Sequence, residues 1–573
     1  PTAAAEEKKD ETIVLQAFTV TGSNIKRLDQ EKTLPVTVID RSTMELRDAS
    51  QASDLLTAMS QITGMPGNET ATLGATARGA NATVSLRGIP SSNTLVLLNG
   101  RRLPPYPISQ SEAGVPTLST NVNQLPNRGL DRIDVLRDGA SSIYGTDAVA
   151  GVINYITRPT FTGTELSLRY GRTNYHDGAE YRATLTHGFE LAGGKGHALL
   201  VADYYDRGAI YARNREFSRE ADNSTRAPAP WNVSTDTTFN LRSATTEYGN
   251  FSTGTVNASG VFTAARPSGV PASLVASSGT FFLAPTATGV GFQTTTPSRT
   301  GVTHDYYWNN NTYRVIQPDS KGGNLFLGGD YRLRSRLSVF AEFNSYNAQS
   351  VTYREPDGIT ASTDGDIIVP ATNPFNPFGT RFWSTTGAAN ADGTPRLTGT
   401  PSAVRITNKR LTDLMQRTAT VDESMYRGVA GLRGQVFETW NWEAALLWAD
   451  SRVTDDEDGP SRKSQIQNAI NQTDPALAFN PFTRTFAVQN GSLVVVGPYV
   501  NSESVQSTFR SHFIRNGIAK LGSGDFRAGG DLFPIWGGNA VGAAFGGEYR
   551  FETYDDFRPP YSGLNPAGSG LDP

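Results

Sequence analysis

The side chains that could carry chemistry in this chain are carboxylates, arginines and aromatic rings. Its 573 residues include no cysteine and only 5 histidines. The lack of cysteine excludes thiol nucleophiles, disulfides and thiolate-bound zinc or iron–sulfur clusters. Carboxylates are numerous, but no motif singles out a catalytic pair or a Ser/His/Asp set. We therefore expect no enzyme activity, no cofactor and no metal site.

Two clusters combine rings with polar groups, as a carbohydrate or siderophore site does. The residues expected to bind a ligand are Arg101, Arg102, Tyr106, Tyr306, Tyr307 and Trp308. The alternative is that these rings only pack the loops that carry them. The acidic run 455–458 has the wrong spacing for a calcium loop, which favours a solvated cluster.

The N-terminal segment has two features of interest. Residues 1–5, Pro-Thr-Ala-Ala-Ala, resemble the start of a mature exported protein, with a trimmed chain as the alternative. Behind a charged leader lies a short β-prone stretch, suited to adding a strand to the sheet edge of a partner. Its residues are Glu11, Thr12, Ile13, Val14 and Leu15. The alternative is that this stretch begins the first strand of the following domain.

Length and charge limit the classes of protein. A formal charge of 51 − 55 = −4 argues against a strong footprint for nucleic acid or for anionic lipid. The length predicts three or four ordinary domains unless one large β architecture accounts for it. With 57 glycines and 10% aromatic residues, the composition favours β structure. No apolar run approaches the roughly 18 residues of a membrane helix.

Residues 29–159 have the pattern of a compact α+β domain. Short apolar runs predict strands at 36–39, 95–98, 133–135 and 152–156. Apolar residues at helical spacing predict one helix between Ser50 and Gly64.

Glycine motifs follow these predicted strands. They are Leu86-Arg87-Gly88-Ile89, Leu98-Asn99-Gly100-Arg101, Leu136-Arg137-Asp138-Gly139 and Ala150-Gly151-Val152-Ile153-Asn154. In this order, and over residues 18–158, they closely resemble the plug domain of TonB-dependent outer-membrane transporters. Asp138-Gly139 departs from the Gly-Pro that the family often has, so the local turn is expected to differ.

The resemblance implies several roles. It identifies residues 11–15 with the TonB box, which the periplasmic domain of TonB would bind by strand addition. It also implies that Arg87 and Arg137 pair with carboxylates of the barrel wall, for which Glu548 and Glu552 are the candidates.

From residue 160 onward, the helical pattern gives way to alternation of apolar and polar residues, which predicts about nine strands. The connections between them alternate in length, as in outer-membrane barrels. Connections 190–196, 332–336 and 437–439 are short, whereas 207–320, 352–423 and 453–511 are long and polar.

A closed barrel with a polar lumen explains the charges on one face of these strands, and Trp440, Trp442 and Trp448 suit aromatic girdles. A soluble sandwich with these rings in its core is the alternative. A barrel wide enough for a plug needs about 22 strands, so we expect the chain to be incomplete at its C-terminus.

The predicted organisation is a periplasmic leader (1–28), a plug domain (29–159) and the first part of a transmembrane barrel (160–573). The expected function is TonB-dependent import of a scarce ligand, such as siderophore-bound iron or an oligosaccharide, across the outer membrane of a Gram-negative bacterium. Outer-membrane lipid, an extracellular small ligand and a surface lipoprotein are the further expected partners. The alternatives are an adhesive or structural barrel without transport and a secreted all-β carbohydrate-binding or hydrolytic protein.

Overall fold

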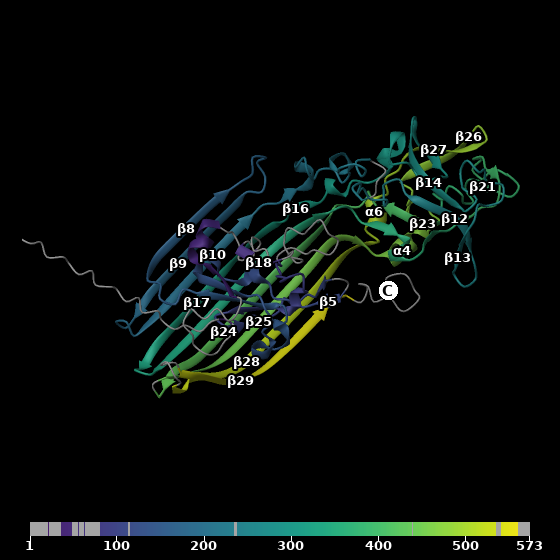
Figure 1. Ribbon diagram of the computed structural model, residues 1–573. Coiled ribbons are helices and arrows are strands. Elements are labelled where there is room, and N and C mark those ends of the chain that lie inside the picture. The colour runs from purple at the N-terminus through teal and green to yellow at the C-terminus, as the bar shows by residue number, and fades with distance from the viewer. Residues whose placement is uncertain are drawn as a thin grey trace, which may run out of the picture.

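The computed structural model of the chain describes residues 21, 36–47, 55–56, 62, 81–112, 115–233, 238–437, 439–534 and 540–559. The described chain forms three parts: a small mixed domain at its N-terminal side, a large antiparallel sheet, and a folded unit at one end of that sheet that is built from connections between its strands (Figure 1). Within the described residues, no helix has the length and apolar character needed to cross a membrane.

The small domain, which we call the plug, is built on a five-stranded sheet. Its strands, in spatial order, are β1 (Val36–Asp40), β6 (Leu130–Leu136), β7 (Gly151–Thr157), β2 (Thr94–Leu98) and β3 (Arg101–Arg102). β2 and β7 run parallel and the other neighbours are antiparallel. Every residue of β2 is buried, as expected for a strand covered on both faces.

All four strands predicted in the plug are present. The predicted helix falls largely outside the described residues, apart from Leu55, Leu56 and Ile62, which are buried in the plug core. The described plug helices are α1 (Arg41–Arg47), α3 (Ser141–Tyr144) and short 3-10 turns, and a hairpin of β4 (Gln110–Glu112) and β5 (Val115–Thr117) follows β3.

The large sheet contains nine antiparallel strands, and we call it the wall. In chain order they are β8 (Gly163–Gly171), β9 (Glu180–Leu191), β10 (Gly196–Arg207), β17 (Asp319–Arg334), β18 (Leu337–Arg354), β24 (Arg417–Val436), β25 (Trp440–Ser461), β28 (Arg510–Pro534) and β29 (Ala540–Phe557). Each wall strand pairs with the next one in this order. The short and long connections alternate as predicted, but the wall strands run farther than predicted into two of the long ones: β18 ends at Arg354, β24 begins at Arg417 and β25 ends at Ser461. The acidic run 455–458 therefore lies in β25 with Asp455 and Glu457 buried, so the expectation of a solvated cluster is wrong.

Alternation gives the wall two different faces. In β25, Ala445, Leu447 and Ala449 are buried, whereas Leu446 and Trp448 are 71% and 52% exposed. Exposed apolar side chains continue across the outer face, including Leu168 on β8 and Tyr549 on β29. The inner face is covered by the plug: Val201 of β10, Phe326 of β17 and Met425 of β24 belong to the same buried cluster as the plug core.

The three long connections fold together at one end of the wall, and we call this unit the cap (residues 208–318, 355–416 and 462–509). β12 (Asn250–Val256), β14 (Thr280–Thr286) and β15 (Gly289–Gln293) of the first connection join β23 (Ala403–Arg410), β19 (Gly358–Thr360) and β20 (Ile367–Val369) of the second in one sheet. α5 (Lys463–Ile470) and the hairpin of β26 (Arg484–Gln489) and β27 (Ser492–Pro498) come from the third.

The cap has its own apolar core. Phe251, Phe378 and Phe482, one from each connection, are fully buried in the same cluster. The polar composition of these segments predicts extended loops, but their scattered aromatic residues meet in space and supply a shared core. The remaining cap elements are the short strands β11 (Ile210–Tyr211), β13 (Phe262–Ala264), β16 (Val315–Gln317), β21 (Trp383–Ser384) and β22 (Leu397–Thr398) and the helices α4 (Ala361–Asp364) and α6 (Glu503–Gln506).

Candidate functional site: the interface between plug and wall

Arg101 provides the strongest polar contact between the plug and the wall. The turn Asn99-Gly100, with φ of 52° and 76°, reverses the chain between β2 and β3 and directs Arg101 toward β25 and β28. Its Nε and Nη2 donate to Asp525 at 2.9 and 3.0 Å, and Nη2 also donates to Glu443 at 2.6 Å. Arg527 donates to the same Glu443 at 2.5 Å. Two positive and two negative side chains therefore balance one another at the interface. We call them the base quartet, after their position at the end of the wall away from the cap: Arg101, Glu443, Asp525 and Arg527.

A second contact has the opposite arrangement, because here the wall provides the cation. Arg427 of β24 is fully buried and pairs with Glu342 of β18 at 3.0 Å. Its Nη2 and Nε donate to the carbonyl oxygens of Leu98 and Arg102 at 3.2 and 3.1 Å. Asn99 of the plug donates to Glu342 at 2.8 Å. The ion pair thus recognises the backbone of the plug hairpin as well as its side chains.

The middle of the interface consists of amides. Asn121 and Gln124 of the plug donate to Glu423 of β24 at 2.7 and 2.6 Å. Asn324 and Asn344 of the wall donate to the main-chain oxygen of Gln124 at 2.7 and 2.9 Å. These contacts are specific in geometry, but neutral donors hold less strongly than paired charges.

The plug segment that follows β3 is held against β28 nearer to the cap. Arg515 donates to Ser109 of the plug at 3.1 Å and pairs with Asp556 of β29. Gly517 allows the close approach, because a Cβ at this position would lie 2.3 Å from the main-chain oxygen of Pro107. β28 therefore contacts the plug at two places, through Asp525 and through Arg515.

A cavity of about 660 Å³ lies between the plug and the wall beside the short connections. Its lining includes Arg101, Glu342 and Glu443, together with Arg433 and Asn154. If the contacts of the base quartet broke, the neighbouring part of the plug could therefore move into a cavity that is already present.

The residues predicted to join plug and wall lie in other contacts. Arg87 has φ of 55° and donates to the carbonyl oxygen of Ala150 within the plug at 3.4 Å. Glu548 and Glu552 flank Arg550 of the same strand, at 3.9 and 2.9 Å. Pairing of Arg87 or Arg137 with wall carboxylates stays a prediction. Residues 11–15 lie outside the described residues.

The residues predicted to bind a ligand are largely occupied by structural contacts. Arg101 belongs to the base quartet, and Arg102 pairs with Asp147 inside the plug at 2.6 Å. Tyr106, at 1% exposure, packs with Val421 and Val453 of the wall. In the cap, Tyr306 and Tyr307 are buried and pack with Phe282, and Trp308 stacks on Tyr313. A ligand-binding role for these residues stays a prediction.

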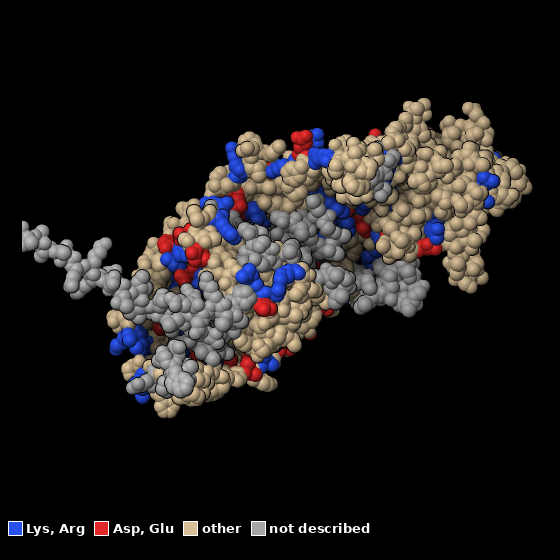
Figure 2. Space-filling model, in the orientation of Figure 1, with Lys and Arg blue, Asp and Glu red and all other residues tan. Residues whose placement is uncertain are grey.

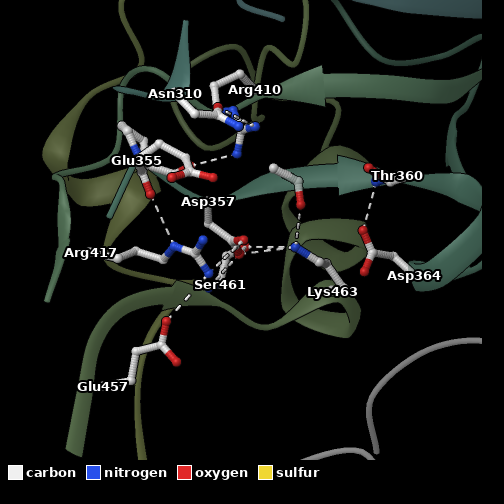
Figure 3. A network of polar contacts seen from close by, with 12 residues as sticks. Asn310, Glu355, Asp357, Thr360, Asp364, Arg410, Arg417, Glu457, Ser461 and Lys463 are labelled. Atoms are coloured by element: carbon white, nitrogen blue, oxygen red, sulfur yellow. Dashed lines mark hydrogen bonds and ion pairs between the residues drawn. The ribbon is translucent and has the colours of Figure 1, made fainter. Parts of the chain in front are cut away.

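The cap is joined to the rim of the wall by a polar network around Asp357 (Figure 3). Asp357 accepts hydrogen bonds from the main chain and hydroxyl of Ser461 and pairs with Lys463 at 3.0 Å and Arg417 at 3.7 Å. Burial alone would raise the pKa of Asp357, but the charges of Lys463 and Arg417 outweigh it and hold the pKa well below its ordinary value. The carboxylate is therefore ionised where the three wall strands β18, β24 and β25 meet the cap.

A buried lysine joins the three parts of the cap. The amine of Lys409 on β23 donates to the carbonyl oxygen of Glu247 and lies 2.9 Å from the hydroxyl of Thr483. These three residues come from three different connections. Burial, together with the charge of Arg484, lowers the pKa of Lys409 to about 7.

Sequence reasoning missed the wall residues of the interface, namely Glu342, Glu423, Arg427, Glu443, Asp525 and Arg515. The sequence signal that could have found them is their position in the alternation, because each of them lies on the face of its strand opposite to the exposed apolar side chains. Alternation identifies that face, but it does not say which of its charges meet the plug.

Comparison with known proteins identifies the plug. Residues 29–152 match the family model described as the TonB-dependent Receptor Plug Domain. The match confirms the resemblance predicted for this part of the chain and covers residues 29–152.

Solved receptors match with low similarity. A mutant of the ferric enterobactin receptor PfeA from Pseudomonas aeruginosa is 12% identical over 92% of this chain and 55% of its own, with a TM-score of 0.39. The ferric-catecholate import receptor Fiu from E. coli K12 is 11% identical over 92% of this chain and 68% of its own, with a TM-score of 0.33. The pyoverdine-bound FpvA from P. aeruginosa is 12% identical over 94% and 55%, with a TM-score of 0.36. The chain spans a little over half the length of PfeA and FpvA.

Proposed function

We propose that the chain belongs to a TonB-dependent receptor of the Gram-negative outer membrane that imports a scarce extracellular ligand. The observation that carries this proposal is a plug domain fixed by paired charges to one face of a sheet whose other face exposes apolar side chains. An apolar outer face fits lipid, and a polar inner face fits a lumen. In this proposal the cap, which consists of the three long connections, faces the outside of the cell.

Energy for import would come from the periplasm, because the outer membrane has no supply of ATP. We propose that residues 11–15 act as the TonB box and add a strand to the periplasmic domain of TonB. A pull on this segment, close in sequence to the plug, would be resisted by the plug–wall contacts. The base quartet is the strongest of these contacts and is the proposed place of release.

The proposed ligand is a siderophore-bound iron or an oligosaccharide, taken up from the cap side, and a surface lipoprotein is a proposed partner. Uptake of radiolabelled ferric siderophores and of labelled oligosaccharides, compared in cells with and without the protein, tests this proposal and separates the two ligand classes.

Deletion of residues 11–15 should abolish uptake of the ligand identified in this way and leave its binding to cells intact. Deletion of residues 2–6 removes the same number of residues from the leader and should leave both unchanged. Uptake that persists without residues 11–15 would contradict the proposed coupling to TonB.

A further inference from the structure

Two neighbouring short connections of the wall carry a cluster of cations. Lys195 lies between β9 and β10, and Arg332, Arg334 and Arg336 surround the turn between β17 and β18. All four are exposed. The two turns are joined, because the main chain of Arg332 donates to the Lys195 oxygen at 2.7 Å and its guanidinium donates to the Gly194 oxygen at 2.9 Å. We call these four residues the basic turn cluster; Figure 2 shows Lys and Arg gathered at this end of the wall, away from the cap.

Within the described part of the chain, the cluster is not neutralised by acidic side chains. Among the described residues, no carboxylate forms an ion pair with any of its four members. The nearby acids have other partners: Asp330 pairs with Arg433 at 3.3 Å, and Glu190 lies 4.0 Å from His197. Arg101 and Arg427 of the interface, by contrast, each have a carboxylate partner. Like charges held close together repel, so this cluster favours an anion from outside the chain.

Apolar side chains beside the cluster indicate where that anion would lie. Leu333, between two of the arginines, is 52% exposed, and Leu327 on the same strand is 48% exposed. Phe189, close to the Lys195 turn, is 39% exposed. Arg336 also lines the cavity between the plug and the wall, and Arg332 lies in phase with Asp330 of the same cavity, so the cluster lies at the rim of the wall, where the inner and outer faces end. This rim is at the depth of lipid headgroups if the outer face lies in a bilayer.

We propose that the basic turn cluster binds the anionic phospholipid headgroups of the leaflet that the short connections face. Guanidinium groups match phosphate oxygens with two parallel hydrogen bonds, and Leu333 beside them suits the acyl boundary. The inference rests on the membrane location in the proposed function. It adds a leaflet-specific lipid contact that sets the depth of the short connections in the membrane.

The test uses the protein in nanodiscs and in detergent, with phosphatidylglycerol and phosphatidylcholine as probes. Native mass spectrometry of protein mixed with equal amounts of the two lipids should show preferential retention of phosphatidylglycerol. The variant Arg332→Gln/Arg334→Gln/Arg336→Gln should lose about fivefold in affinity per arginine, on the order of a hundredfold in all. Added salt should weaken the wild-type preference.

The matched control is Arg172→Gln/Arg219→Gln/Arg266→Gln, which removes three exposed arginines from the cap-side connections and should keep the preference. Equal loss in both variants, or no preference in the wild type, would overturn the inference. Displacement of the lipid by inorganic phosphate at equal concentration would also overturn it, because the site would then be one for free phosphate. Failure of the protein to enter nanodiscs of either lipid would instead refute the membrane location itself.

Discussion

Replacing Arg101 with methionine should loosen the plug from the wall while leaving each of them folded. Arg101 is 8% exposed and is a partner of both Asp525 and Glu443. Methionine keeps much of the side-chain volume and removes the charge. Glu443 would keep Arg527, but Asp525 would lose the guanidinium that binds both of its oxygens.

The expected free-energy cost of Arg101→Met follows from the loss of the partner of Asp525. Removing one partner of a buried ion pair costs about 3–5 kcal/mol, because the remaining charge is left without compensation. The carboxylates are partly accessible, at 20% for Asp525 and 19% for Glu443, so water can reach them and the lower end applies. About 3 kcal/mol corresponds to a shift on the order of a hundredfold toward the undocked plug.

Hydrogen exchange of the plug strands in the protein provides the assay. β2 and β7 should exchange faster in Arg101→Met by a factor of this order, whereas wall strands remote from the interface should not change. Arg102→Met is the matched control, because Arg102 is the next residue and its charge pairs with Asp147 inside the plug.

The double variant Arg101→Met/Asp525→Leu sharpens the test. If the cost comes from an uncompensated carboxylate, removing that carboxylate should restore most of the protection. Equal effects of Arg101→Met and Arg102→Met, or a double variant as loose as the sum of the two single variants, would refute the reasoning.

Three further outcomes are expected. Gly517→Val should displace the plug segment around Pro107, because the valine Cβ would lie 2.3 Å from the Pro107 main-chain oxygen. Hydrogen exchange at residues 103–112 should then rise. Unchanged exchange would show that this segment is not pressed against β28. The pKa of Asp357 is lower in the fold than its ordinary value of 3.8, so its carboxylate should stabilise the fold fully above pH 3.8 and lose this contribution as the pH falls below that value. In Asp357→Asn, the midpoint of thermal unfolding should therefore fall less steeply on the acid side of its pH profile. The pKa of Lys409 is lowered from 10.5 to about 7, so the cap should become less stable as the pH falls from 10.5 to 7, with no further change below 7. Lys409→Met should remove this dependence of cap stability on pH. The same dependence in both proteins would contradict the buried amine.

The order of strands could be predicted from the sequence because it depends on local patterns. Alternation around Leu166 and Tyr549 marks wall strands, and the Asn99-Gly100 turn marks the plug hairpin. Short and long connections follow from where these patterns stop. Each of these signals lies within about twenty residues of chain.

The interface and the cap could not be predicted in the same way. Arg101 and Asp525 are 424 residues apart, and nothing near either one identifies the other. Sequence analysis therefore read Arg101, in a segment rich in rings and proline, as a ligand contact. The cap core joins Phe251, Phe378 and Phe482 across three connections, each of which alone has too few apolar residues to predict a folded unit.

The central claim, a plug held on the inner face of the wall that must move for import, is tested by cross-linking. The chain has no cysteine, so Ser109→Cys and Arg515→Cys provide a unique pair across the 3.1 Å contact between their side chains. A short bis-maleimide should join the two cysteines in cells, block ligand uptake and leave ligand binding intact, while either single variant treated in the same way keeps uptake. Absence of the cross-link, or full uptake with the plug joined to β28, would contradict the account.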